Sequence, residues 1–134
     1  MIILDAKRTT LGRLASYAAK EALKGEEISI LNCGDAIITG NFKFSKKNFE
    51  EKRGKVGTLQ KGPKYPSTSE KIVKRTIRGM LPDPRGGRGR EALKRIKCYS
   101  KIPKEYENSK TFRIQEKKKI KYSELKKFTR ENSF

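Results

Sequence analysis

The feature that most constrains the fold is the order of three segments within the first 32 residues. Residues 1–7, MIILDAK, and 26–32, EEISILN, each contain the short apolar run of a buried strand, and residues 9–25, TTLGRLASYAAKEALKG, repeat apolar residues at helical spacing. Two parallel strands need a crossover of about a dozen or more residues, and the intervening helix has that length. This order predicts an α/β domain whose first two strands are parallel.

The predicted first helix has two different faces. Thr9 or Thr10 can cap its start, and Gly25 can end it. At about 100° per residue its apolar side chains fill one arc, which we expect to pack on the sheet. The opposite arc is largely basic and consists of Arg13, Tyr17, Lys20 and Lys24.

A second two-faced helix is predicted over residues 67–82, STSEKIVKRTIRGMLP. Ser67 and Glu70 have the spacing of a capping box, and Pro82 marks the stop. One arc holds Ile72, Val73, Thr76, Ile77, Met80 and Leu81, and the opposite arc holds Lys71, Lys74, Arg75 and Arg78. Like charges at this spacing destabilise a helix by about 0.2 to 0.5 kcal/mol per pair. The basic stripe is therefore best explained by phosphates bound against it.

The rest of the chain is less regular. Residues 41–55 predict a short helix and residues 56–69 a surface loop. A glycine- and arginine-rich loop, PDPRGGRGR, is followed by a brief helix, EALKRI, and a strand, IKCYS. After Pro103 the chain is highly charged, and a small terminal helix is indicated by Tyr122, Leu125 and Phe128. We predict an α/β domain over 1–102 and a charged C-terminal extension over 103–134 that docks on something else.

The charge of the chain indicates its partner. Lys and Arg number 34 against 15 Asp and Glu, which gives a formal net charge of +19 and an isoelectric point near 10.1. Solubility alone needs far less charge, so a polyanion is the expected partner. Charged residues make up 37% of the chain, above the usual ~25%, and we expect the isolated protein to be partly disordered.

Several classes of function are excluded or disfavoured by composition. The chain has no histidine, which removes Ser-His and Cys-His nucleophile pairs and imidazole metal ligands. Its two cysteines, Cys33 and Cys98, lie in apolar surroundings, and we expect free, buried thiols that cannot form a zinc site by themselves. No window approaches the ~20 apolar residues that cross a bilayer, and we expect an unexported, membrane-free protein.

The junction DAKRTTLGR between the first strand and helix is a candidate phosphate site. Helix N-terminal N–H groups attract anions, and Lys7, Arg8 and Arg13 add positive charge. The spacing matches neither a P-loop nor a dinucleotide fingerprint. A purely structural explanation is that Gly12 lets the helix pack on the sheet and that Asp5 caps the strand end.

The glycine- and arginine-rich loop is a second candidate. Arg85, Arg88 and Arg90 offer planar forks for phosphates, and the loop is either ordered on RNA or a solvated hinge. A third group consists of aromatic residues among basic ones, which can stack on unpaired bases or anchor the core. These are Phe42, Phe44, Phe49, Tyr65, Tyr106, Phe112 and Tyr122, of which we expect Tyr65 to be the most exposed.

The segments TLGRLAS, NCGDAIITGN and RTIRGMLPDPRGGRGREALKRIKCY closely resemble the universal family of large-ribosomal-subunit protein 13, over about residues 1–103 and in its archaeal form. The resemblance implies a three-layer α/β/α fold with a mainly parallel four-stranded sheet and a basic C-terminal extension. It also implies a non-enzymatic, structural role in the large ribosomal subunit, in which the protein binds and helps fold 23S-type ribosomal RNA during assembly.

From these observations we expect ribosomal RNA and neighbouring large-subunit proteins as partners, on cytoplasmic ribosomes. We expect no catalysis, cofactor, metal, small-molecule substrate or membrane, and no homo-oligomer. Two other classes stay open: a nucleotide-dependent enzyme with its pocket at DAKRTTLGR, and a DNA-compacting protein. The expected RNA-binding residues are Lys7, Arg8, Arg13, Lys46, Lys47, Arg53, Lys64, Tyr65, Lys71, Lys74, Arg75, Arg78, Arg85, Arg88, Arg90 and Lys94.

Overall fold

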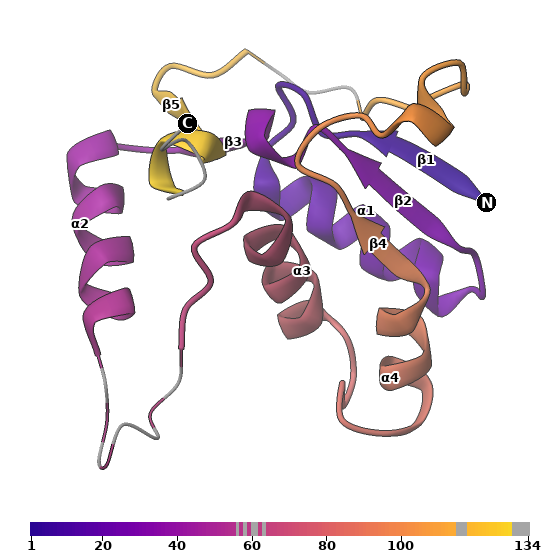
Figure 1. Cartoon of the computed structure of the whole chain (residues 1–134), viewed down its shortest axis with the longest axis horizontal. Helices are drawn as coiled ribbons and strands as arrows, with labels where there is room; N and C mark the ends of the chain where they lie inside the picture. The colour runs from indigo at the N-terminus through magenta and orange to yellow at the C-terminus, as the bar shows by residue number, and fades with distance from the viewer. Residues whose placement is uncertain (56, 58, 60–61, 63, 115–117, 130–134) are drawn as a thin grey trace.

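The structure is a computed structural model that describes residues 1–55, 57, 59, 62, 64–114 and 118–129 (Figure 1). The strands are β1 (Ile2–Asp5), β2 (Ile28–Leu31), β3 (Ile37–Thr39), β4 (Ile96–Cys98) and β5 (Tyr122–Glu124). The helices are α1 (Leu11–Leu23), α2 (Phe42–Gly54), α3 (Ser69–Met80) and α4 (Gly87–Lys94), with short 3-10 turns η1 (Cys33–Asp35), η3 (Lys104–Tyr106) and η4 (Leu125–Phe128). Of the predicted surface loop, residues 56, 58, 60, 61 and 63 lie outside the described residues.

The predicted α/β class and the parallel first strands are confirmed. Strands β1, β2 and β4 form a parallel sheet in that order, with Ile2 beside Ile28 and Ile28 beside Ile96. The expected four-stranded sheet is wrong for the described residues, because this sheet has three strands and β3 pairs antiparallel with β5 in a second sheet. A fourth position beside β1 is taken by a bridge between Leu4 and Phe112. The three-layer arrangement stays a prediction.

The core forms where one face of the parallel sheet meets α1 and α3. Side chains from alternate strand positions, including Leu4, Ile30 and Ile96, are fully buried in one cluster with Ile77 of α3. The contact face of α1 carries four buried alanines, and their small size lets α3 and α4 pack closely against α1. Burying each large aliphatic side chain contributes roughly 1.5–3 kcal/mol. The predicted apolar arc of α1 is therefore confirmed.

Helix α3 begins one residue later than its capping box predicts. The N-cap is Thr68, whose side chain makes no capping hydrogen bond, so the proposed pairing of Ser67 with Glu70 is wrong. The stop before Pro82 is confirmed, since Leu81 is extended and the helix ends at Met80. Met80, the last residue of the helix, is 43% exposed and does not fasten the helix to the core.

The predicted glycine- and arginine-rich loop is shorter than expected. Helix α4 already begins at Gly87, so Arg88 and Arg90 lie on a helix and only residues 82–86 form a connecting loop. The loop is short because α4 packs closely on it: Gly89 is buried against the carbonyl of Pro82. A glycine inside the motif therefore serves close packing of the helix and not loop mobility.

The C-terminal segment folds back onto its own domain. Leu125 and Phe128 are buried in the core cluster, and β5 pairs with β3, so for these residues the expected docking on something else is wrong. The indicated terminal helix is the 3-10 turn η4. Phe128 also holds α2, whose Phe42 and Phe49 rings lie 5.3 and 5.2 Å from it. Figure 1 shows α2 standing at the side of the molecule, away from the parallel sheet.

Candidate nucleic-acid interface

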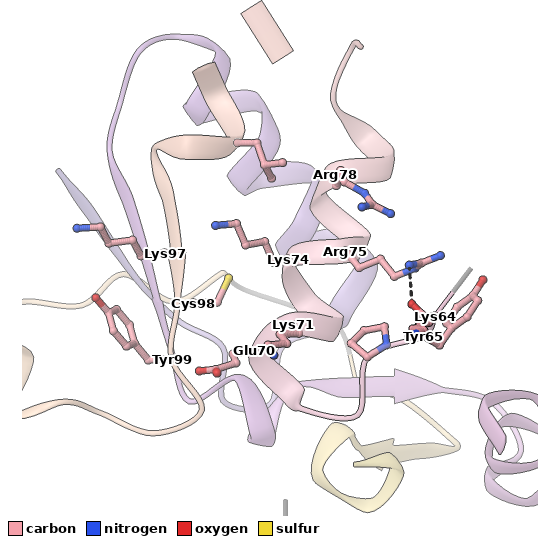
Figure 2. Close-up of a pocket in the computed structure, with 12 residues that line it drawn as sticks. Lys64, Tyr65, Glu70, Lys71, Lys74, Arg75, Arg78, Lys97, Cys98 and Tyr99 are labelled. Carbon is pink, nitrogen blue, oxygen red and sulfur yellow. Dashed lines mark hydrogen bonds between the residues drawn. The ribbon is translucent and has the colours of Figure 1, made fainter. Parts of the chain in front are cut away.

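A groove of about 740 Å³ runs along α3, between strand β4 on one side and residues 64–66 on the other (Figure 2). The basic stripe of α3 forms its centre, because the opposite stripe is buried against α1 and leaves these side chains facing outward. The groove is lined by Lys64, Tyr65, Pro66, Glu70, Lys71, Lys74, Arg75, Arg78, Leu93, Lys97, Cys98 and Tyr99.

The charge in this groove is strongly positive and largely uncompensated. Six of its lining residues are Lys or Arg, and Glu70 is the one acid among them. Lys71, Lys74 and Lys97 make no ion pair within the residues that the structure describes. Cations brought this close repel one another, and a bound phosphate chain relieves that repulsion. The predicted two-faced character of α3 is confirmed, and its basic face meets a concave surface.

Arg75 organises one side of the groove. Its guanidinium lies 4.1 Å from the centre of the Tyr65 ring, and it donates a hydrogen bond to the carbonyl of Lys64 at 3.4 Å. The ammonium of Lys52 approaches the same ring at 5.3 Å. These contacts hold residues 64–66 against α3. Tyr65 is consequently half-buried, and the expectation that it is the most exposed aromatic is wrong, since Phe44 is 67% exposed.

Strand β4 supplies the other side of the groove through Cys98, and Tyr99, which follows the strand, points away from α3 toward Tyr106 (Figure 2). Burial, and then the neighbouring Tyr106 hydroxyl, raises the pKa of Tyr99, so its hydroxyl stays neutral. The hydrogen bond with Cys98, and then burial, raises the pKa of the Cys33 thiol well above its usual value. Both cysteines are free, as predicted. Cys98, however, is only half-buried and borders the groove.

The junction of β1 and α1 is occupied by the chain's own residues. Asp5 accepts hydrogen bonds from the Lys7 amide and the Asn32 side chain, each at 3.0 Å, and from Arg113 at 2.5 Å. Its role as a cap at the strand end is confirmed. Lys119 donates a hydrogen bond to the Thr10 hydroxyl at the start of α1. A Cβ at Gly12 would meet nothing within 4 Å, so the idea that this glycine permits close packing is wrong.

The predicted binding residues fall into four places in the structure. Six of them line the groove, namely Lys64, Tyr65, Lys71, Lys74, Arg75 and Arg78. Arg85, Arg88, Arg90 and Lys94 are exposed on and before α4, and Lys7, Arg8 and Arg13 are exposed at the junction of β1 and α1. On α2, Lys46 and Lys47 are exposed, whereas Arg53 is half-buried and donates hydrogen bonds to the carbonyls of Phe128 and Pro66.

The family model for ribosomal protein L13 matches residues 1–105, which include every residue that lines the groove. The chain belongs to the ribosomal protein L13 family. Three archaeal relatives carry the name large ribosomal subunit protein uL13. The protein of Thermoplasma volcanium is 44% identical over 114 residues, covering 85% of this chain and 82% of its own length. The proteins of Methanosarcina barkeri and Methanocaldococcus jannaschii are 44% and 45% identical, over 85% and 78% of this chain and 81% and 77% of theirs.

Six groove residues of this L13-family chain were not predicted from its sequence: Pro66, Glu70, Leu93, Lys97, Cys98 and Tyr99. Glu70 is expected in a cap and Pro66 in a surface loop. The other four carry no local signal, because residues 97–99 come close to α3 only through the parallel pairing of β2 with β4, and Leu93 only through the packing of α4 on α1. Within the described residues no cluster of three metal-binding side chains occurs, and no helix is long and apolar enough to span a bilayer.

Proposed function

We propose that the protein is a non-catalytic, structural constituent of the large ribosomal subunit that binds and helps fold 23S-type ribosomal RNA during assembly. The observation that carries this proposal is the groove along α3, where six cations face one acid. Phosphate contacts of this kind position a protein on RNA without reading its sequence, so the shape of the folded RNA supplies the specificity. Membership of the ribosomal protein L13 family supports the same role.

The remaining basic residues extend the proposed contact. Arg88 and Arg90 on α4, with Arg8 and Arg13 beside β1, are exposed and available to further phosphates. We also propose that neighbouring large-subunit proteins adjoin this chain on cytoplasmic ribosomes, and that it does not homo-oligomerise. The alternative nucleotide site at the junction of β1 and α1 is disfavoured, because Arg113 and Lys119 from the C-terminal segment already bind the polar groups there.

Salt dependence tests the proposal. If about 6–10 phosphates are neutralised, affinity for a large-subunit RNA fragment falls by about 10³ to 10⁵ between about 50 and 200 mM salt. Changing Lys74 and Arg78 together to Gln should weaken binding and reduce the salt slope by up to about 2. The matched control changes Lys20 and Lys110, two exposed lysines outside the proposed interface, and should leave most of the slope intact.

Two results would contradict this function. One is an association that salt does not weaken. The other is easy displacement of the folded RNA by duplex DNA, which would indicate a DNA-compacting protein without shape recognition. Filter binding or fluorescence anisotropy with the full chain, at four or more salt concentrations, measures both.

A further inference from the structure

The groove along α3 is not uniformly basic. On the side that borders β4 the groove is lined by Leu93 of α4 and by Cys98, whose side chain points toward α3, whereas the Tyr99 side chain points away from α3 and lies against Tyr106 (Figure 2). An aliphatic side chain and a thiol offer phosphates no strong hydrogen bond, and a surface that only neutralised a duplex would not need them. A volume of about 740 Å³ also falls within the roughly 300–1,000 Å³ of small-ligand pockets. Part of the groove is therefore suited to an apolar, flat group that is joined to phosphates.

The cations of α3 are divided between the two sides of the groove. Figure 2 shows Lys74 directed toward β4, whereas Arg75 is directed the other way, toward Lys64. Arg75 and Arg78 thus provide positive charge on the side of α3 away from β4, next to the apolar surface formed at β4 and not over it. A nucleic-acid backbone that passes over these two arginines would present its base toward β4.

Glu70 adds a constraint on that base. It lies one turn before Lys74 on α3, which places both side chains on the side of the helix that faces β4. Its carboxylate forms no hydrogen bond or ion pair with any described residue. A carboxylate repels phosphate and accepts hydrogen bonds from N–H groups of a base. The end of the groove near Glu70 is therefore suited to the donor edge of a base.

We propose that this groove receives one unpaired nucleotide of the bound RNA, with its phosphates at Arg75 and Arg78 and its base between α3 and β4. This inference rests on the proposed function and deepens it. A paired base has both faces stacked within the duplex, so only an unpaired base can offer a face to Leu93 and Cys98. Guanine fits Glu70 best, because two adjacent N–H groups of its pairing edge match the two carboxylate oxygens.

The test uses the full chain and three RNA hairpins that differ only in the stem: fully paired, with one bulged guanosine, or with one bulged uridine. Anisotropy at one salt concentration should give about tenfold tighter binding of the guanosine bulge than of the paired hairpin, with the uridine bulge between them. A bulged 2-aminopurine should change its fluorescence on binding, which reports insertion of the base without any protein variant.

A pair of variants tests the role of Glu70. Glu70→Gln should remove the preference for guanosine over uridine, and Glu105→Gln, which removes the same charge from an exposed position outside the groove, should keep it. Circular dichroism verifies that both variants are folded.

The outcomes separate this inference from the proposed function. Equal affinity for all three hairpins, with an intact salt slope, overturns the nucleotide site alone. Displacement of the bulged hairpin by a polyglutamate peptide that carries the same number of negative charges overturns it too, because charge alone would then explain the binding. Failure to bind any RNA overturns the proposed function as well. Selective binding of the bulged hairpins, with the Glu70 effect, supports both.

Discussion

At the scale of single residues, Gly89 shows how a motif that looks like a flexible loop can be a packing device. A Cβ at this position would lie 1.5 Å from the Pro82 carbonyl oxygen, which belongs to the backbone and cannot rotate away. Gly89→Ala should therefore lower the free energy of unfolding by about 1–3 kcal/mol, measured by urea denaturation. The matched control is Gly12→Ala, where the new methyl group meets nothing and should stabilise α1 by up to about 1 kcal/mol. Equal effects of the two changes would contradict this packing.

Asp5 and Arg113 provide a second test at this scale, through pH. Burial raises the pKa of Asp5, but hydrogen bonds from Arg113, Asn32 and the Lys7 amide outweigh burial and leave that pKa below its ordinary value of 3.8. A lowered carboxyl pKa stabilises the fold above the ordinary pKa, and this stability is lost as pH falls through the lowered value.

The variant Arg113→Gln should accordingly raise the pKa of Asp5. At pH 7 it should cost about 0.5–1 kcal/mol, a modest value because Arg113 is more than half exposed. The cost should begin to shrink as the pH falls below about 4, where Asp5 of the variant becomes protonated, and should disappear below the lowered pKa of Asp5 in the unaltered protein. Denaturation curves between pH 2.5 and 7 measure the difference, with Lys110→Gln as a control that should show none. A cost independent of pH would exclude the Asp5 mechanism.

At the scale of elements, the two faces of each helix were predictable from the sequence. The contacts that the helix ends and the groove make with distant segments were not. The arcs of α1 and α3 follow from side-chain spacing alone, and the structure buries Ile72, Val73 and Ile77 as that spacing predicts. Met80 has the same spacing but lies in the last turn, where its side chain is less buried than those of the other three residues. The site shows the same division, since the basic stripe is local to α3 whereas Cys98 reaches the groove through the pairing of distant strands.

This division predicts opposite results for two substitutions on the same arc of α3. Ile77→Ala should destabilise the protein by about 2–5 kcal/mol, because Ile77 is fully buried in the core cluster. Met80→Ala should change stability by no more than about 0.5 kcal/mol, because the side chain is exposed. Thermal or urea unfolding of the two variants measures the contrast. A large loss of stability in Met80→Ala would instead show that Met80 packs in the core.

At the scale of the whole molecule, the C-terminal segment is the part that sequence pattern described least well. Its high charge indicates an extension, and its few apolar residues predict only a small terminal helix at Tyr122, Leu125 and Phe128. Two of them nevertheless complete the core, because β5 pairs with β3 and carries η4 to the surface left between α2 and η1. Long-range pairing of this kind has no local signature. The segment thereby links α2, which has no buried residue of its own, to the rest of the protein.

The strength of that link can be measured with two apolar residues of the same segment. Phe128→Ala should cost about 3–5 kcal/mol, because the ring is 2% exposed and packs against both Phe42 and Phe49. Ile120→Ala should cost almost nothing, because that side chain is 99% exposed. Urea denaturation gives both values, and limited proteolysis should release the C-terminal segment much faster from the Phe128 variant. If the two variants unfold at the same urea concentration, the segment does not belong to the cooperative core, and α2 must be held in the isolated protein by some other contact.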